Sequence, residues 1–459
     1  MEIAKFLLLV GLLVLAVQCS QTEEQKFLGN LAKHYDGGYH HFVSFKEFLD
    51  QVRRARYKDY KCSAVRDEEA FTEMKNHILK MYEGVKRVGD VTSFMLEGEY
   101  GDCLLIEEQP TVHHLGIKKI AKPPQNSTHT EKGHGSAPGN SSYADSPLKL
   151  GLRDRFGHPI SSPKSRIPMA RLTLEKLTRF STLQDFFSKP SDSPSRLERR
   201  DFTTQEAHLH ARGIQEVTNF GGNSWLDLWN PTGDFSISQH WYPGLNGDAP
   251  KQTVEGGWVM NRLSYPNSDQ SRLFIYYTAD NYNKLKCWNL DCTAFVQINH
   301  NWYLGGPWDH YSKMDGEQWG FEMQWKLYQG NWWLFLKGPG AYEAVGYYPT
   351  SIYNGGQLSR NATLIKFGGE VANYVGGNNF PQMGSGALAE KGWREAAFQK
   401  TIFWIPRDEN DGFGVWANLT ASDEGKESCY TVEVVNWPDD GDWGTYIYFG
   451  GPGGDNCPR

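Results

Sequence analysis

The sequence predicts a mostly β protein, in which an antiparallel β-sandwich follows a smaller α+β region. Three observations indicate this fold class. All 16 tryptophans lie after residue 220, which marks a boundary between two kinds of sequence. Beyond that point, short runs of aromatic and β-branched residues alternate with clusters of Gly, Asn, Asp and Pro, and no helical pattern comes between them. Many short strands at such spacing are typical of a sandwich or a barrel.

The first residues predict export. A lysine precedes an apolar run from Phe6 to Val17, and small and polar residues follow it, which is the layout of a secretory signal peptide. We therefore expect residues 1–20 to be removed. A lipid anchor on Cys19 is a weaker alternative, because no small residue precedes it. No later apolar run reaches the roughly twenty residues that span a bilayer, so we expect a secreted, extracellular protein with no membrane association.

Residues 21–120 are predicted to form an activation or pro region of mixed secondary structure. The segment from Ser44 to Glu47 fits a capping box, and apolar residues then recur at helical spacing, as they do again in 71–85. Around Cys103 the pattern changes to that of a strand. These apolar residues are interpreted as packing faces.

Residues 121–165 are rich in Pro, Ser, Gly and Asn, and they are predicted to be a linker that is too polar to pack. Residues 166–200 are predicted to end the pro region. Their apolar pattern over 174–187 predicts one short amphipathic helix, which a Pro- and Ser-rich segment ends. The pair Arg199–Arg200 is a candidate processing site, although adjacent arginines are more often only solvated charges.

Residues 201–459 are predicted to form the β domain. Its expected strands are 235–241, 272–277, 294–298, 321–327, 332–336, 363–367, 430–435 and 446–449. The charge also differs between the two parts, since residues 1–200 have a net charge of +5 and residues 201–459 one of −12. Opposite net charges favour association of the two parts.

Two short segments of the β domain each place one glutamate beside a pair of glycines. They are Thr253–Trp258, which contains Glu255, and Phe367–Val371, which contains Glu370. Glycine lets another backbone approach a strand closely, and a peptide substrate is such a backbone. Two carboxylates in one site can divide into a general base and a general acid, because like charges separate their pKa values. Most glutamates are solvated surface charges, so this pattern alone is only a hypothesis.

Removal of the signal peptide leaves six cysteines, an even number that suits disulfides in an oxidising compartment. Four sequons are acceptors for N-glycosylation in a eukaryotic host, at Asn126, Asn140, Asn361 and Asn418. The sequence has no Gly-x-x-x-x-Gly-Lys phosphate loop, no His-Glu-x-x-His zinc motif and no Gly-x-Ser-x-Gly nucleophile motif. We therefore expect no metal and no cofactor.

In their order along the chain, these motifs resemble the neprosin family of glutamic peptidases. The resemblance extends from about His208 to Pro458. Besides the two glutamate segments, it includes Phe235-Ser-Ile-Ser-Gln-His-Trp241, Cys287-Trp-Asn-Leu-Asp-Cys292 and Tyr448-Phe-Gly-Gly-Pro-Gly453. Segments Asp102–Pro110 and Ile167–Arg171 likewise resemble the pro region of that family.

The resemblance implies a secreted zymogen whose catalytic domain is a β-sandwich over residues 201–459. It also implies that Glu255 and Glu370 are the only catalytic acids. One would deprotonate the water that attacks the scissile carbonyl, and the other, protonated, would donate to the carbonyl oxygen or to the leaving amine. Which glutamate has which role stays open.

The resemblance further implies two disulfides, Cys287–Cys292 and Cys429–Cys457. The family's pro region commonly has a second cysteine before the Ile-Pro stretch, and this chain lacks it. Cys103 is therefore left without its usual partner, and Cys62 is a candidate substitute. A zinc site built from the cysteines is the competing interpretation, which the lack of a Cys-x-x-Cys spacing weakens.

The expected function is that of an acid-acting glutamic endopeptidase. Some relatives cut beside proline, and the preference of this chain stays open. We expect a monomer whose partners are a polypeptide substrate and its own pro region as inhibitor, with no nucleic acid. The alternative is a non-catalytic secreted β-sandwich that binds carbohydrate or cell-wall glycan through its aromatic side chains. Such a module would need neither a pro region nor the two glutamates.

Overall fold

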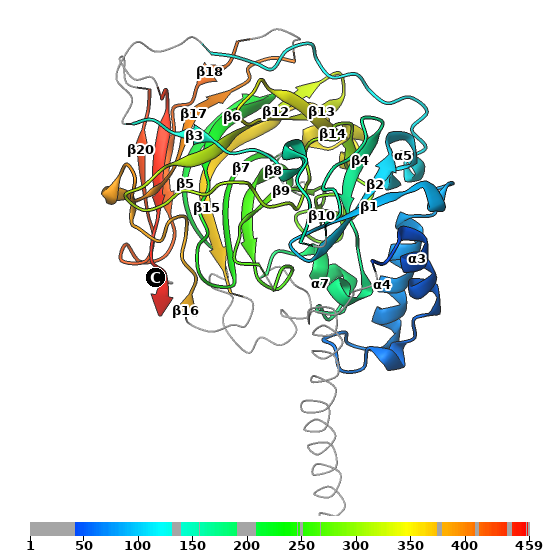
Figure 1. The fold of residues 1–459 in the computed structure, drawn as a ribbon. Helices are drawn as coiled ribbons and strands as arrows, with labels where there is room; N and C mark the ends of the chain where they lie inside the picture. Colours follow the sequence, from blue (N-terminus) through cyan, green and yellow to red (C-terminus); the bar gives the residue numbers. More distant parts are fainter. Residues whose placement is uncertain are drawn as a thin grey trace, which may run out of the picture. The chain divides into compact units, whose positions relative to one another are not determined.

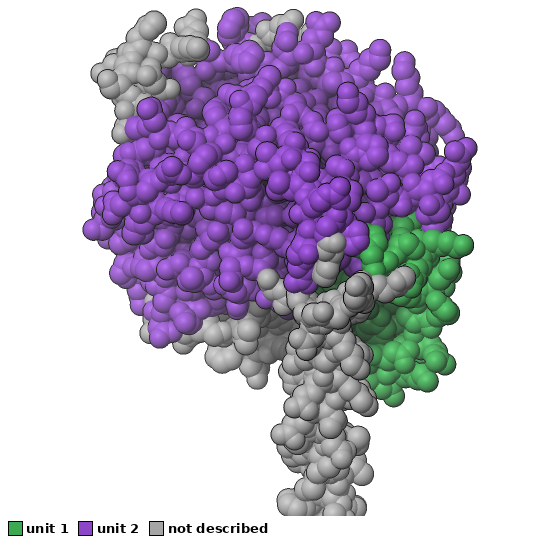
Figure 2. Space-filling view, in the orientation of Figure 1, with its two compact units in different colours: residues 1–80, 173–183 green, residues 81–172, 184–459 purple. Residues whose placement is uncertain are grey.

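The computed structural model describes residues 42–130, 139–155, 157–190, 208–245, 247, 251–266, 268–373, 379–408, 413–437, 443–455 and 457. The predicted signal peptide, the start of the predicted pro region and the Arg199–Arg200 pair lie outside these residues. The chain divides into two compact units, residues 1–80 with 173–183 and residues 81–172 with 184–459 (Figure 2). The predicted division into signal peptide, pro region, linker and catalytic domain concerns processing of the chain, and it stays a prediction.

The first unit is helical where it is described. Helix α3 (Phe45–Arg54) begins at the predicted capping segment, where the Ser44 hydroxyl accepts a hydrogen bond of 3.2 Å from the backbone N–H of Glu47. Helix α4 (Glu68–Met81) buries the apolar residues at helical spacing, among them Phe71, Met74 and Ile78. Neither these nor the other described helices are long and apolar enough to cross a membrane.

The single helix predicted over residues 174–187 is wrong. This segment forms two short helices, α6 (Leu174–Leu177) and α7 (Leu183–Phe187). Between them, the carbonyl of Thr178 accepts a hydrogen bond of 2.9 Å from the backbone N–H of Ala64. That carbonyl accepts a hydrogen bond from a distant part of the chain rather than from the next turn of a helix. The spacing of the apolar residues could not predict this contact.

The second unit contains a small antiparallel sheet in the order β1 (Thr92–Leu96), β2 (Glu99–Leu105), β4 (Arg166–Ala170). Strand β2 confirms the strand predicted around Cys103. Just after β4, the buried Arg171 guanidinium donates to both carboxylate oxygens of Asp102 on β2, at 2.8 and 2.6 Å. This two-point ion pair fastens the Ile-Pro-Met-Ala-Arg segment to the sheet.

The described disulfides join Cys287 to Cys292 and Cys429 to Cys457, which are the two pairs that the resemblance implies. Cys103 is instead a free and buried thiol. The residue belongs to an apolar cluster with Phe94 and Ile160, and its thiol donates to the carbonyl of Ser161 at 3.6 Å. The predicted pairing of Cys103 with Cys62 is therefore wrong.

Two large sheets of the second unit form the predicted sandwich (Figure 1). The seven-stranded sheet has the order β10 (Lys286–Trp288), β9 (Arg272–Thr278), β8 (Gln252–Asn261), β7 (Phe235–Gly244), β15 (Ala362–Ala372), β5 (His208–Asn219), β19 (Thr420–Asp423). The main path of the other sheet is β11 (Val296–Gln297), β14 (Glu343–Pro349), β13 (Asn331–Lys337), β12 (Trp319–Tyr328), β6 (Gly221–Asp227), β17 (Ala397–Trp404), β21 (Tyr446–Gly450), β20 (Thr431–Val435). Strands β18 (Val415–Trp416) and β3 (Ser142–Tyr143) pair with β17 and β12, and β16 (Asn379–Phe380) pairs with β22 (Gly454–Asp455).

The inner faces of the two large sheets are in direct contact. Tyr242 of β7 stacks on Trp332 of β13, with ring centroids 6.5 Å apart. Eleven of the 16 tryptophans are buried, and Trp437 is the only one among the exposed large apolar side chains of the described residues. The aromatic residues therefore build the core of the sandwich rather than an exposed face for stacking on sugar rings.

The described part of the predicted linker packs against the ten-stranded sheet. Strand β3 pairs in parallel with β12. The backbone N–H of the buried Thr128 donates a hydrogen bond of 2.7 Å to the side chain of Gln324 on β12. Hydrogen bonds to the sheet, together with the buried side chains of Leu148 and Ile160, thus hold a segment whose composition predicted that it would not pack.

Candidate active site

Strand β7 lies between β8 and β15 and pairs antiparallel with both. Glu255 on β8 is paired with Trp241 of β7, and Glu370 on β15 is paired with Ile237 of β7. Both glutamates are buried, with 0% and 2% of their surfaces exposed. The seven-stranded sheet thereby brings the two predicted carboxylates into one buried region.

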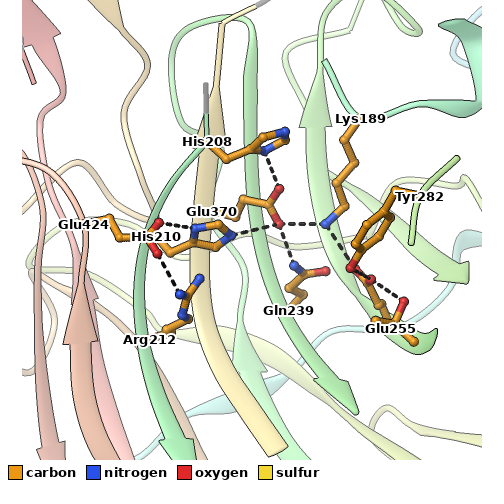
Figure 3. A network of polar contacts seen from close by, with 10 residues as sticks. Lys189, His208, His210, Arg212, Gln239, Glu255, Tyr282, Glu370 and Glu424 are labelled. Carbon is orange, nitrogen blue, oxygen red and sulfur yellow. Dashed lines mark hydrogen bonds and ion pairs between the residues drawn. The ribbon is translucent and has the colours of Figure 1, made fainter. Parts of the chain in front are cut away.

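A single lysine joins the two carboxylates. The Nζ atom of Lys189 lies 3.0 Å from Oε2 of Glu255 and 2.7 Å from Oε2 of Glu370 (Figure 3). The Lys189 side chain is only 5% exposed. The segment before it is held in place, because the Tyr276 hydroxyl donates a hydrogen bond of 2.9 Å to the carbonyl of Phe187. One ammonium group is thus shared by two buried carboxylates and offsets one of their two negative charges.

The other oxygen of Glu255 accepts two hydroxyl hydrogen bonds. Thr253 Oγ1 lies 2.6 Å from Glu255 Oε1, and the hydroxyl of Tyr282 lies 2.7 Å from the same oxygen. Burial, and then the charge of Glu255, raise the pKa of Tyr282 well above its usual value. Tyr282 therefore stays protonated, and its hydroxyl donates to Glu255 beside that of Thr253.

Glu370 is surrounded by nitrogen atoms. Its Oε2 atom accepts a hydrogen bond of 2.8 Å from the side-chain amide of Gln239 on β7. Two histidines of β5 face the same carboxylate: His208 Nδ1 lies 2.7 Å from Oε1, and His210 Nε2 lies 3.8 Å from Oε2. Both histidines come from the strand that pairs with β15, and His210 is directly opposite Glu370 in the register.

The charges of the site hold one another ionised. Burial alone would raise the pKa of the Glu370 carboxyl, but the Lys189 ammonium and then the neighbouring histidines hold that pKa well below its usual value. Burial alone would also lower the pKa of Lys189, whereas the charges of Glu255 and Glu370 raise it above its usual value. The arrangement is therefore a closed ion-paired cluster at neutral pH.

The glycines beside the glutamates serve the sheets and not an incoming peptide. A Cβ atom on Gly368 would lie 2.3 Å from the carbonyl oxygen of Ala211 on the neighbouring strand β5. A Cβ atom on Gly256 would lie 2.7 Å from the sulfur of Met323 on β12 of the facing sheet. The prediction that these glycines admit a substrate backbone is therefore wrong, because the chain itself fills the space.

Replacing Gly368 by alanine should therefore destabilise the fold. Gly368 has φ of +144°, and the new Cβ would meet backbone that cannot rotate away. We expect a loss of about 2 kcal/mol or more in the free energy of unfolding. Gly340→Ala is the matched control, since nothing lies within 4 Å of a Cβ atom there. Thermal unfolding of both variants measures this, and equal midpoints would contradict the expectation.

Sequence reasoning missed most partners of the two glutamates. Lys189 was interpreted only as part of a helix-ending segment. His208 and His210 alternate along one strand, so their common face could have been recognised from the spacing. Gln239 lies within a motif of the family resemblance, but no pattern assigned it a contact. Among the described residues, no cluster of three or more His, Cys, Asp or Glu side chains could hold a metal ion.

Two comparisons with known proteins found matches to this chain. A family model described as Neprosin matches residues 232–452, a range that includes both glutamates. The chain is also similar to a crystal structure of scytalido-glutamic peptidase with a peptide-based transition-state analogue, at 11% identity and a TM-score of 0.30. A second structure of that peptidase, with a transition-state analogue inhibitor, has 12% identity and a TM-score of 0.27. Each match covers 53% of this chain and 98% of the other.

Proposed function

We propose that this chain, whose residues 232–452 match the family model described as Neprosin, belongs to that family and is a secreted glutamic endopeptidase made as a zymogen. Glu255 and Glu370 are its catalytic pair. The observation that supports this proposal most strongly is that both buried carboxylates converge on a single nitrogen atom, at 3.0 and 2.7 Å. A pair at this spacing can hold one proton between two acids once the cation leaves.

The pair supplies both halves of peptide hydrolysis. The ionised glutamate takes a proton from a water molecule, and the water oxygen bonds to the scissile carbonyl carbon. The protonated glutamate then gives its proton to the leaving amine as the carbon–nitrogen bond breaks. Both steps need one carboxylate and one carboxylic acid in the same site. Burial of two like charges favours a state in which one of the two carboxyl groups is protonated.

The described arrangement represents the latent form in this proposal. Lys189 belongs to the segment predicted to end the pro region, and Ser188, Lys189 and Pro190 are all buried. The Lys189 ammonium lies where a substrate would have to approach the carboxylates. It also favours the state in which both glutamates are ionised, so that no proton is left for the leaving group. Latency thus has a steric and an electrostatic cause.

The ion pair determines how the latent form responds to pH. The pKa of Glu370 is depressed from its usual value of 4.5, so the pairing stabilises the latent form above that pH. This stabilisation is lost as the pH falls through the depressed pKa. Acid therefore favours release of Lys189, at a pH well below 4.5. Carboxylates elsewhere protonate near pH 4, which weakens the attraction between the +5 and −12 parts of the chain in the same direction.

Release would expose the chain to cleavage between Pro190 and His208, by the enzyme itself or by another protease. Secretion is supported by the two disulfides, which need an oxidising compartment. Among the predicted glycosylation sites, Asn126, Asn140 and Asn418 are exposed and Asn361 is partly exposed. These positions are accessible to a glycosylating enzyme.

Incubation of the purified full-length protein with a proline-rich polypeptide tests the proposed function. Samples taken between pH 2 and 7 are analysed by mass spectrometry of the fragments. We expect cleavage in the acid samples, and the fragment ends then report whether cuts occur beside proline. The absence of any new fragment at every pH, even after the protein's own N-terminal segment has been removed, would contradict a peptidase function.

Inhibitors should distinguish this chemistry from the other peptidase classes. We expect a chelator, a serine-directed reagent and a thiol-directed reagent each to leave the rate of cleavage unchanged. The proposed reaction uses only two carboxyl groups and water, and the free Cys103 is buried in an apolar cluster. The rate is measured on the same polypeptide at one acid pH. Strong inhibition by the chelator would contradict the glutamate pair and indicate a metal site.

A further inference from the structure

A second carboxylate lies behind His210, on the side away from Glu370. The Nδ1 atom of His210 is 2.5 Å from Oε2 of Glu424, which follows strand β19. The other oxygen of Glu424 accepts a hydrogen bond of 2.7 Å from the guanidinium of Arg212. The backbone N–H of Glu424 donates to the carbonyl of His210 at 2.8 Å. Glu370, His210, Glu424 and Arg212 thus form a chain of contacts across three neighbouring strands (Figure 3).

This chain of contacts fixes where the imidazole proton lies. A ring nitrogen 2.5 Å from a carboxylate oxygen must donate, so the proton of a neutral His210 is on Nδ1. Burial raises the pKa of Glu424, but His210 and Arg212 outweigh it and bring that pKa to about 2, so the acceptor stays ionised. The Nε2 atom of a neutral His210 then has no proton, and this atom faces Oε2 of Glu370.

His210 is neutral at pH values above about 4. Burial lowers the pKa of His210 to about 4, although Glu424 and Glu370 oppose the shift and Arg212 adds to it. The charged or titratable groups that face it are Glu370 on β15, Glu424 beyond β19, and His208 and Arg212 on its own strand. Above that pH, His210 offers Glu370 a hydrogen-bond acceptor and not a positive charge.

We propose that His210, held by Glu424 and Arg212, is a positioning residue that keeps Glu370 protonated, so that Glu370 is the general acid and Glu255 the general base. This inference rests on the proposed function. In the latent form Lys189 occupies Oε2 of Glu370, and His210 stands 3.8 Å away. Once Lys189 leaves, a movement of about 1 Å brings that oxygen within hydrogen-bond distance of Nε2. A protonated Glu370 then donates to an acceptor already in place.

The two glutamates differ in the groups that remain after Lys189 leaves. Glu255 keeps two hydroxyl donors on Oε1, which stabilise negative charge on that oxygen. Glu370 keeps the amide of Gln239 on Oε2 and His208 Nδ1 at 2.7 Å from Oε1. It also gains the basic nitrogen of His210 at Oε2, and a hydrogen-bond acceptor there favours the protonated form. In the reaction, Glu255 receives the proton of water and Glu370 gives its proton to the amine. Solvent then returns the protons to their starting positions, so the cycle balances without another reagent.

Three variants of the full-length protein test this assignment after the same acid incubation as the wild type. His210→Asn can still reach Glu424 but leaves no acceptor for Glu370, and Glu424→Gln removes the charge that fixes the proton on Nδ1. We expect kcat to fall about 10- to 100-fold in both, with KM nearly unchanged. Glu424→Asp keeps the carboxylate and should recover part of the loss. Glu433→Gln, the same substitution as Glu424→Gln on the exposed side of β20, is the control and should match the wild type.

The pH profile separates a positioning role from a merely structural one. The basic limb of kcat reports loss of the proton from the general acid. Without the acceptor, Glu370 loses its proton more easily, so this limb should move by about one unit to lower pH in His210→Asn. The acid limb, which is assigned to the general base Glu255, should keep its position on the pH axis. Spectra of ¹⁵N-labelled histidine should show the Nδ1–H tautomer for His210 at pH 6.

The outcomes are distinct. An active wild type together with a His210→Asn variant of unchanged kcat and unchanged basic limb would overturn the positioning role while leaving the glutamate pair in place. An Nε2–H tautomer for His210 would overturn it as well. A wild type with no activity under any condition would overturn the proposed function itself, and this inference with it.

Discussion

Replacing either Glu255 or Glu370 by glutamine is expected to reduce kcat/KM by about 10³-fold or more. An amide has nearly the shape of the carboxyl group, but it can neither take a proton from water nor give one to the leaving amine. The two residues act as one unit, so the double variant should be hardly less active than either single variant. Cleavage of one polypeptide at a fixed acid pH measures all three rates.

Folding must be checked in the same variants, because each loses half of a buried ion-paired cluster. Lys189 keeps one ionised partner in each single variant. Circular dichroism and the thermal midpoint report whether the sandwich is intact, and Glu433→Gln serves as the matched surface control. A folded Glu255→Gln or Glu370→Gln variant that keeps most of its activity would show that the pair is wrongly assigned.

The second large effect is expected from Lys189→Met, which keeps the length of the side chain and removes its charge. The two buried carboxylates then face each other without a cation, so one of them binds a proton at a higher pH. We expect conversion of the full-length chain to begin about one to two pH units higher than in the wild type. Lys189→Arg keeps a positive charge and is the control. Gel electrophoresis over a pH series measures the midpoint of conversion.

The free energy of unfolding of Lys189→Met should also depend on pH in a characteristic way. Removing one partner of a buried charge cluster costs about 3–5 kcal/mol, and in Lys189→Met this cost applies while both glutamates are ionised. The folded-state pKa of the pair rises above its unfolded value, so the destabilisation is large near pH 7 and disappears below about pH 4. Thermal midpoints that differ from the wild type by the same amount at pH 7 and pH 4 would contradict this account.

The sequence predicted those features that repeat or that follow a known family pattern. Alternation of apolar and polar residues identified the strand around Ile237, and a short apolar run identified the strand around Trp332. The capping segment identified Ser44 as the start of a helix. The glutamates were found because each stands beside a glycine pair within a family motif. Their glycines were misinterpreted, since only the structure shows that Ala211 and Met323 occupy the space beside them.

The features that could not be predicted depend on contacts between distant segments. Lys189 is 66 residues from Glu255 and 181 from Glu370, and a lysine before a proline gives no sign of such a role. Glu424 reaches His210 only because β19 pairs with β5. The polar linker was expected not to pack against the domain. Its hydrogen bonds to Gln324 could have been predicted only if its pairing with β12 had been known.

A pH series of the full-length wild-type protein tests the central claim most directly. After incubation at each pH, peptidase activity is measured at that pH and again in parallel at one acid pH, and the N-terminus of every band is sequenced. The account predicts an inactive chain at neutral pH with residues 21–200 still attached. After incubation in acid it predicts an active form that begins between Pro190 and His208. Full activity at neutral pH with Lys189 still in the chain would contradict it.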